Sequence, residues 1–117
     1  MRLIGTYLTD TENEALAEFK KALVDLLGSS LLVLRLFGSK ARGDFSRSSD
    51  LDVAVVIQGD VNRKLRNRIY EIAFDITFAA DYTFNLSPVI FTEEEFMRLK
   101  DEEWRIALDI IDEGIDI

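Results

Sequence analysis

Two short apolar runs separated by a loop rich in glycine and serine constrain this fold more than any other feature. The runs are Leu31–Phe37 and Leu51–Ile57. Their length, and the glycine, serine and aspartate residues around them, predict strands buried on both faces of a sheet. Residues 38–49 between them predict a turn and a loop, with one helical turn over Ser39–Arg42.

Helical periodicity appears in three other segments. The predicted helices cover residues 11–27, residues Val61–Ala80, and a C-terminal stretch that begins after Thr92 and ends at Gly114. Thr11 lies three residues before Glu14, and Thr92 lies three residues before Glu95, so each pair predicts a capping box. Gly28 is a typical stop signal for the first helix.

A third strand is predicted over Tyr82–Phe91, although Pro88 interrupts it. Proline cannot donate a ladder hydrogen bond, so this strand is expected at an edge of the sheet. The order of elements predicts a small three-stranded sheet with helices packed against it. The length of 117 residues, without a linker or repeat, predicts one domain over residues 1–117.

Composition excludes several classes of site and of partner. The chain contains no histidine and no cysteine, so any metal must be held by oxygen ligands, as Mg²⁺, Mn²⁺ or Ca²⁺ are. A net charge of −8 argues against general binding to nucleic acid backbones, which requires a basic surface. No apolar stretch is long enough for a membrane span, and residues 1–5 turn polar too early for a signal peptide. A cytoplasmic protein is therefore expected.

Polar groups that suit phosphate and metal gather between the two apolar runs. Gly38 and Ser39 follow the first run, where glycine allows a ligand to approach the backbone closely. Lys40 and Arg42 add positive charge for phosphate oxygens. Two carboxylates, Asp50 and Asp52, stand at the start of the second run. The strand period of two places them on one face of the sheet.

Each of these features alone has an ordinary structural explanation. Gly-Ser after a strand is usually a turn, and Asp-x-Asp is common in solvated loops. Their combination on one strand–loop–strand unit favours a site, because two carboxylates beside an apolar strand repel each other unless a cation intervenes. The unit is therefore predicted to bind nucleotide phosphates and a divalent metal.

The same residues resemble a known family. Residues 38–44 read Gly-Ser-Lys-Ala-Arg-Gly-Asp, and residues 49–55 read Ser-Asp-Leu-Asp-Val-Ala-Val. This pattern resembles the minimal nucleotidyltransferases of the DNA polymerase β-like superfamily. The resemblance implies an α+β nucleotidyltransferase fold with a small mixed three-stranded sheet flanked by helices.

The resemblance also implies an activity, cofactors and partners. The resemblance puts Gly38 and Ser39 at the phosphates of an NTP, ATP being favoured, and the charges of Lys40 and Arg42 add them to the predicted nucleotide-binding residues. Asp50 and Asp52 would be catalytic ligands of Mg²⁺ or Mn²⁺. The family reaction is attack of an acceptor on the α-phosphate with release of pyrophosphate. An antitoxin-type protein beside a helical HEPN-type partner is implied, while homo-oligomerisation stays open.

One expected carboxylate is missing from this pattern. Active members carry a third acidic residue on the next strand, and Asn85 stands where it is expected. Asparagine offers a neutral oxygen ligand and cannot act as a base. The substitutes in the chain are Asp44, Asp75 and Asp81, of which Asp81 would reach the site in another strand register. A nucleotide-binding interaction protein without catalysis, or a nucleotide sensor, therefore remains an alternative to the enzyme.

Two further features leave alternatives open. Arg35 is the one charge in the first apolar run, and it could face a helix end, a partner or bound phosphates. Phe74, Phe78 and Phe84 could form an apolar patch that faces a partner, or belong to a wide apolar helix face.

Overall fold

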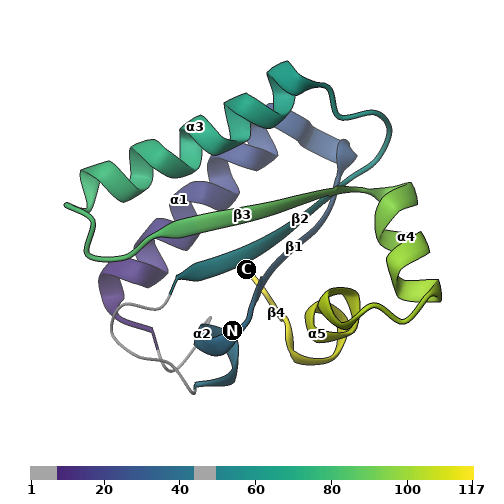
Figure 1. Ribbon diagram of the computed structural model, residues 1–117. Helices are drawn as coiled ribbons and strands as arrows, with labels where there is room; N and C mark the ends of the chain where they lie inside the picture. Colours follow the sequence, from purple (N-terminus) through teal and green to yellow (C-terminus); the bar gives the residue numbers. More distant parts are fainter. Residues whose placement is uncertain (1–7, 44–49) are drawn as a thin grey trace.

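A mixed sheet lies at the centre of the computed structural model, which describes residues 8–43 and 50–117. Within these residues the sheet has four strands, in the order β3-β2-β1-β4. β1 is antiparallel to β2 and β4, while β2 and β3 are parallel (Figure 1). The strands are β1 (Leu31–Phe37), β2 (Leu51–Ile57), β3 (Leu86–Thr92) and β4 (Ile115–Asp116).

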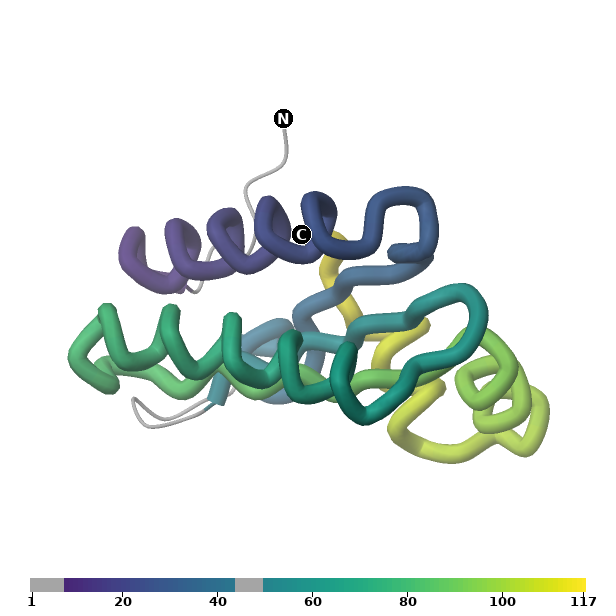
Figure 2. The backbone as a smooth tube through the Cα atoms, turned by 90° about the horizontal axis from the view of Figure 1, so that it is seen from above, coloured from purple at the N-terminus to yellow at the C-terminus, as the bar shows by residue number. Residues whose placement is uncertain are grey.

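Helices cover the two faces of this sheet unequally. They are α1 (Asp10–Leu27), α2 (Ser39–Arg42), α3 (Arg63–Ala79), α4 (Glu93–Asp101) and α5 (Arg105–Glu113), with a 3₁₀ turn over Gly28–Ser30. The long helices α1 and α3 lie side by side along one face (Figure 2). The short helices α4 and α5 lie against the other face.

Alternation along β2 divides the core between these two faces. The odd-numbered residues of β2 are buried in the larger cluster with Phe19, Leu23 and Ile69 of α1 and α3. Ala54 and Val56 point the opposite way and pack with Phe96 and Ile110 of α4 and α5. Because the strand period is two, Asp52 belongs to the face that α4 and α5 cover.

The first helix differs from its prediction at the cap. α1 begins at Asp10, and Thr9, not Thr11, is the N-cap. Thr9 Oγ1 accepts from the N–H of Glu12 at 3.1 Å, and the N–H of Thr9 donates to Glu12 Oε1 at 2.9 Å. The sequence holds two overlapping Thr-x-x-Glu boxes, and the one that forms is the one whose glutamate is buried. The helix predicted over Val61–Ala80 corresponds to α3 and is shorter, since Asn62 caps its N-terminal end.

Three predictions for the C-terminal half were wrong in detail. β3 begins at Leu86 and not at Tyr82, because Asp81 and Tyr82 adopt positive φ angles of 59° and 58° in a turn. The C-terminal helix is two helices, broken where Glu103 has a φ of 57°. The sheet gains a fourth strand, β4, which pairs with β1 over only two residues. The edge position of the strand that contains Pro88 is confirmed.

Arg35 faces a helix end, which was one of its three predicted environments. Its guanidinium donates to the carbonyl oxygens of Ile110 and Ile111, both at 3.2 Å, near the C-terminal end of α5. Its Nε donates to Asp116 Oδ1 at 2.7 Å. Arg35 therefore fastens α5 and β4 to the middle of the sheet, because a cation favours the negative end of a helix.

An exposed aromatic cluster lies on the last turns of α3 and in the turn that follows it. Phe74, Phe78 and Tyr82 are exposed, and their ring centroids lie 5.9–6.5 Å apart. Phe84, predicted to join them, is instead buried in the core. The apolar patch therefore exists with Tyr82 in place of Phe84.

Among the described residues, helices long and apolar enough to cross a membrane are absent.

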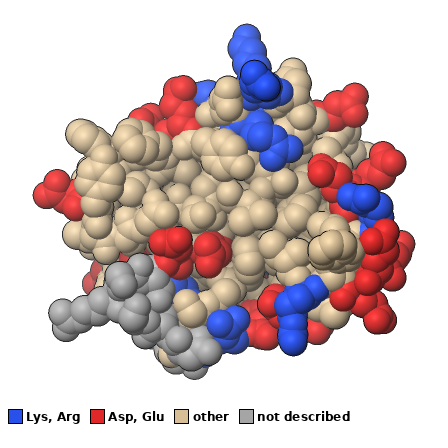
Figure 3. All heavy atoms as spheres, viewed as in Figure 1, with Lys and Arg blue, Asp and Glu red and all other residues tan. Residues whose placement is uncertain are grey.

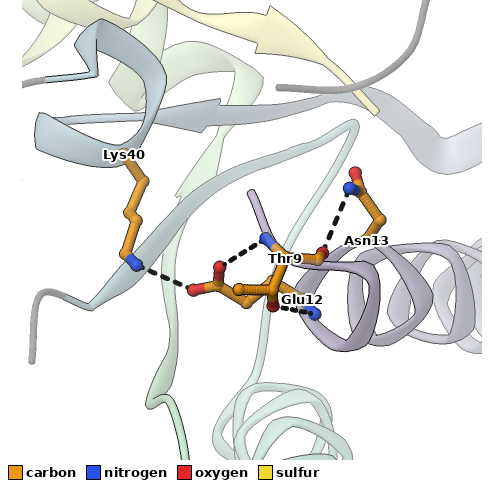
Figure 4. Close-up of polar contacts among 4 residues, drawn as sticks. All are labelled: Thr9, Glu12, Asn13 and Lys40. Carbon is orange, nitrogen blue, oxygen red and sulfur yellow. Dashed lines mark hydrogen bonds and ion pairs between the residues drawn. The ribbon is translucent and has the colours of Figure 1, made fainter. Parts of the chain in front are cut away.

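A buried ion pair joins the start of α1 to the short helix α2 (Figure 4). Lys40 Nζ lies 2.8 Å from Glu12 Oε2, and both residues are almost fully buried. Burial acts to raise the pKa of Glu12, but hydrogen bonds from Lys40 and Thr9 outweigh it, so the pKa lies below its ordinary value. The same glutamate thus caps α1 and holds α2 in place.

Removing the cation of this pair should cost far more stability than removing one from the surface. Lys40→Met leaves a buried carboxylate without its partner, and we expect the free energy of unfolding to fall by about 3–5 kcal/mol. Arg68→Met, which breaks an exposed 2.7 Å pair with Glu71, should cost less than about 1 kcal/mol. Urea unfolding at neutral pH measures both.

The pH dependence follows from the lowered pKa of Glu12. The unfolded chain binds this proton more readily than the folded chain, so the contribution of the pair is complete above about pH 4.5 and is lost as the pH falls below it. The gap between wild type and Lys40→Met should therefore narrow below pH 4.5. An equal cost for Lys40→Met and Arg68→Met would contradict this role.

Candidate nucleotide and metal site

The ends of three strands meet at one edge of the sheet. β1 ends at Phe37, and β2 and β3 begin at Leu51 and Leu86 beside it. In the register of the sheet, Asp52 lies between Phe37 of β1 and Ser87 of β3. The two predicted carboxylates therefore stand where the chain enters β2, beside the end of β1.

Gly38 makes a close approach to one of these carboxylates. It has a φ of 78°, and a Cβ atom placed on it would lie 2.8 Å from Asp52 Oδ2. Both the backbone conformation and the space therefore require glycine. The strand register and this glycine bring the main chain that opens α2 directly beside Asp52.

Asp50 and Asp52 differ in their surroundings. Asp50 is exposed just before β2, and Asp52 is half-buried within it. Burial raises the pKa of Asp52, and the negative charge of Asp50 raises it further. Acidic side chains are visible at the start of β2, apart from the larger acidic group over α4 and α5 (Figure 3). A cation at this position would relieve the repulsion between the two carboxylates.

The predicted phosphate-binding residues are only partly brought together. Ser39 follows Gly38 at the start of α2, at the same edge of the sheet. Arg42 is exposed at the end of α2, with its Nη1 3.5 Å from Glu113 Oε2 of α5. Lys40 Nζ is buried and lies 2.8 Å from Glu12 Oε2 of α1. The structure therefore pairs Lys40 with α1.

Two polar residues at the start of β3 lie level with the carboxylates: Asn85, just before the strand, and Ser87, within it. Asn85 is exposed one residue before β3, and its carbonyl accepts from the N–H of Leu51 at 2.8 Å. Ser87, which sequence reasoning did not select, is the direct neighbour of Asp52 in the parallel register. The alternation of buried and partly exposed residues along β3 could have indicated Ser87. The start of that strand, however, was predicted four residues too early.

Asp75 and Asp81, two of the three proposed acidic substitutes, do not join this pair. Asp75 is exposed on α3, and Asp81 is exposed in the turn before β3. Asp44 lies outside the described residues. Among the residues that the structure describes, groups of three or more acidic side chains able to hold a metal ion are absent.

The donor set nevertheless fits a hard divalent cation. Carboxylate oxygens are the ligands that Mg²⁺ prefers, and Mg²⁺ is commonly held by one or two carboxylates together with substrate phosphates. Asp50 and Asp52 supply two such groups, and Asp52 lies directly beside the main chain at Gly38. The arrangement suits a metal that arrives with a nucleotide.

The fold has a counterpart among solved structures. A crystal structure of a mutant of the toxin–antitoxin pair MntA–HpeT contains a chain with this fold, at a TM-score of 0.54 and 19% sequence identity. The match covers 86% of this chain and 69% of that one. At this identity the likeness concerns the fold.

The family follows from the sequence match over most of the chain. A model of the nucleotidyltransferase domain matches residues 16–117, and the chain belongs to this family. Two proteins of Methanocaldococcus jannaschii that carry the provisional name protein adenylyltransferase are similar to it. One is 35% identical over 78 residues, covering 67% of this chain and 77% of the relative. The other is 30% identical over 103 residues, covering 88% and 94%.

Two glycine substitutions separate backbone strain from the contact with Asp52. Gly38 and Gly59 both have positive φ angles, but a Cβ on Gly59 would meet no atom within 4 Å. Gly59→Ala should therefore cost about 1–2 kcal/mol of unfolding free energy through backbone strain alone. Gly38→Ala should cost more, because Asp52 must also move, and it should weaken Mn²⁺–ATP binding in calorimetry. Equal effects of the two changes on both measurements would exclude the close approach as a feature of the site.

Proposed function

We propose that this chain transfers AMP from ATP to a hydroxyl group of a protein acceptor. The acceptor oxygen forms a bond to the α-phosphorus, the bond from that phosphorus to the bridging oxygen of the β-phosphate breaks, and pyrophosphate leaves. The acceptor proton passes to solvent. The observation that carries this proposal is the pair Asp50 and Asp52 beside Gly38, in a chain of the nucleotidyltransferase family.

Each residue of the site has a role in this proposal. Asp50 and Asp52 would hold Mg²⁺ or Mn²⁺, which when bound offsets the negative charge of the phosphates. The main chain at Gly38 and the hydroxyl of Ser39 would contact phosphate oxygens, and Arg42 lies at the same edge of the sheet. Because Lys40 is engaged with Glu12, it would act by positioning α2 and not by touching the nucleotide.

Two observations support a protein as the acceptor. The relatives from Methanocaldococcus jannaschii carry the provisional name protein adenylyltransferase. A chain of the same fold occurs in the toxin–antitoxin pair MntA–HpeT. We therefore propose a helical HEPN-type protein as the partner and acceptor.

A second function is favoured by the residues of β3. Asn85 and Ser87 are both neutral, so neither of them supplies a base beside Asp52. Among the described residues, a third acidic side chain does not join Asp50 and Asp52. A chain that binds nucleotide through the same site and acts only by binding its partner would need no such base. The two functions share the nucleotide site and differ in whether AMP is transferred.

The transfer can be tested with ATP labelled at different phosphates. The protein is incubated with Mg²⁺, ATP and the protein encoded beside it, then separated on a denaturing gel. Label from the α-phosphate should remain on protein, while label from the γ-phosphate should be lost with pyrophosphate. Asp50→Asn and Asp52→Asn should each lower the transfer at least about 100-fold. Asp60→Asn, in the exposed turn after β2, is the matched control and should leave it unchanged.

Binding separates the two functions. Retained calorimetric binding of Mg²⁺–ATP without transfer would favour the interaction protein over the enzyme. If Asp50→Asn and Asp52→Asn bind Mg²⁺–ATP as tightly as wild type does, both functions fail at this site.

A further inference from the structure

We propose that the hydroxyl group of Ser87, and not the amide of Asn85, completes the metal site beside Asp52 as a neutral oxygen ligand. This inference rests on the proposed function, because it concerns the cation that Asp50 and Asp52 would hold. It assigns to β3 a ligand that lies outside the predicted set.

The register of the sheet places Ser87 beside Asp52. β2 and β3 are parallel, and the two residues are direct partners across the pair. Neighbouring strands lie about 4.8 Å apart, which suits two side chains that share one cation. On its other side Asp52 has Phe37 of β1, whose ring offers no ligand.

Alternation along β3 shows that Ser87 points to the same face as Asp52. Leu86 and Ile90 are buried in the core under α1 and α3. Val89 and Phe91 pack in the cluster with Ala54 and Val56, under α4 and α5. Since the period of a strand is two, Ser87 belongs with Val89 and Phe91, on the face of Asp52.

Exposure distinguishes Ser87 from Asn85. Ser87 is half-buried like Asp52, while Asn85 is exposed and lies outside β3, level with Asp50. The backbone carbonyl of Asn85 is already bound to the N–H of Leu51. Ser87 is therefore level with the half-buried carboxylate of Asp52, and Asn85 with the exposed carboxylate of Asp50.

The charge of the site follows from this assignment. Two carboxylates and a hydroxyl carry a formal charge of −2, so one divalent cation balances them. A hydroxyl is a weak ligand compared with a carboxylate, so free metal should bind weakly until phosphate oxygens join it. The described residues thus form a site that favours a metal–nucleotide complex over the bare ion.

Mn²⁺ binding without nucleotide tests the position directly. Ser87→Asp should raise the affinity for Mn²⁺ at least about tenfold, because a unit negative charge is added beside a divalent cation. Asn85→Asp is the matched control, and its gain should stay below about threefold. Ser87→Ala should weaken Mn²⁺–ATP binding about three- to tenfold with little change in thermal unfolding, which keeps the test valid if Ser87→Asp does not fold.

A double substitution tests whether the two positions face one cation. Asp52→Asn should abolish Mn²⁺ binding, and Asp52→Asn combined with Ser87→Asp should recover a large part of it. A larger gain in Asn85→Asp than in Ser87→Asp, or no recovery in the double variant, would overturn the assignment. If AMP transfer by wild type persists in that case, the proposed function stands without it. Absence of Mn²⁺–ATP binding in wild type would remove both.

Discussion

The close approach of Gly38 to Asp52 is the constraint on which the arrangement of this site depends. It exists because β1 and β2 pair in a register that sets Phe37 opposite Asp52, so the next residue passes directly beside the carboxylate. Only glycine accepts both the positive φ and the missing space. The chain then turns into α2, which the buried pair of Glu12 and Lys40 ties to α1. Two independent interactions therefore fix the segment from Gly38 through α2.

On the sheet face that α4 and α5 cover, the apolar packing does not extend to the start of β2. α4 and α5 pack on Ala54 and Val56, toward the end of β2, but at its start this face carries Asp52, with Asp50 just before the strand. Keeping a half-buried carboxylate next to a second one has a cost, which the raised pKa of Asp52 expresses. Such a cost is frequent at functional sites, where a ligand offsets it. The net charge of −8 does not explain the raised pKa of Asp52, since most acidic residues are exposed to solvent in other parts of the molecule.

The strand–loop–strand unit was predictable from sequence because local signals and burial agree there. The bounds of β1, α2 and β2 match the prediction, since apolar runs and glycines mark their ends. Elements set by tertiary contacts were harder to predict. Lys40 looked like a phosphate ligand, but its partner Glu12 lies 28 residues away in sequence. β4 forms through pairing with β1 and through Arg35, and the turn at Asp81 and Tyr82 hid the start of β3 and with it the position of Ser87.

The central claim is that a metal–nucleotide complex binds where β1, β2 and β3 meet, and the most direct measurement is paramagnetic broadening of backbone amide signals. Mn²⁺ is titrated into the protein with a non-hydrolysable ATP analogue. The amides of Gly38, Asp52 and Ser87 should broaden first, while Gln58 and Thr92, at the opposite ends of the same strands, should stay sharp. Preferential broadening over the acidic helices α4 and α5, with Gly38 and Asp52 unaffected, would contradict the account.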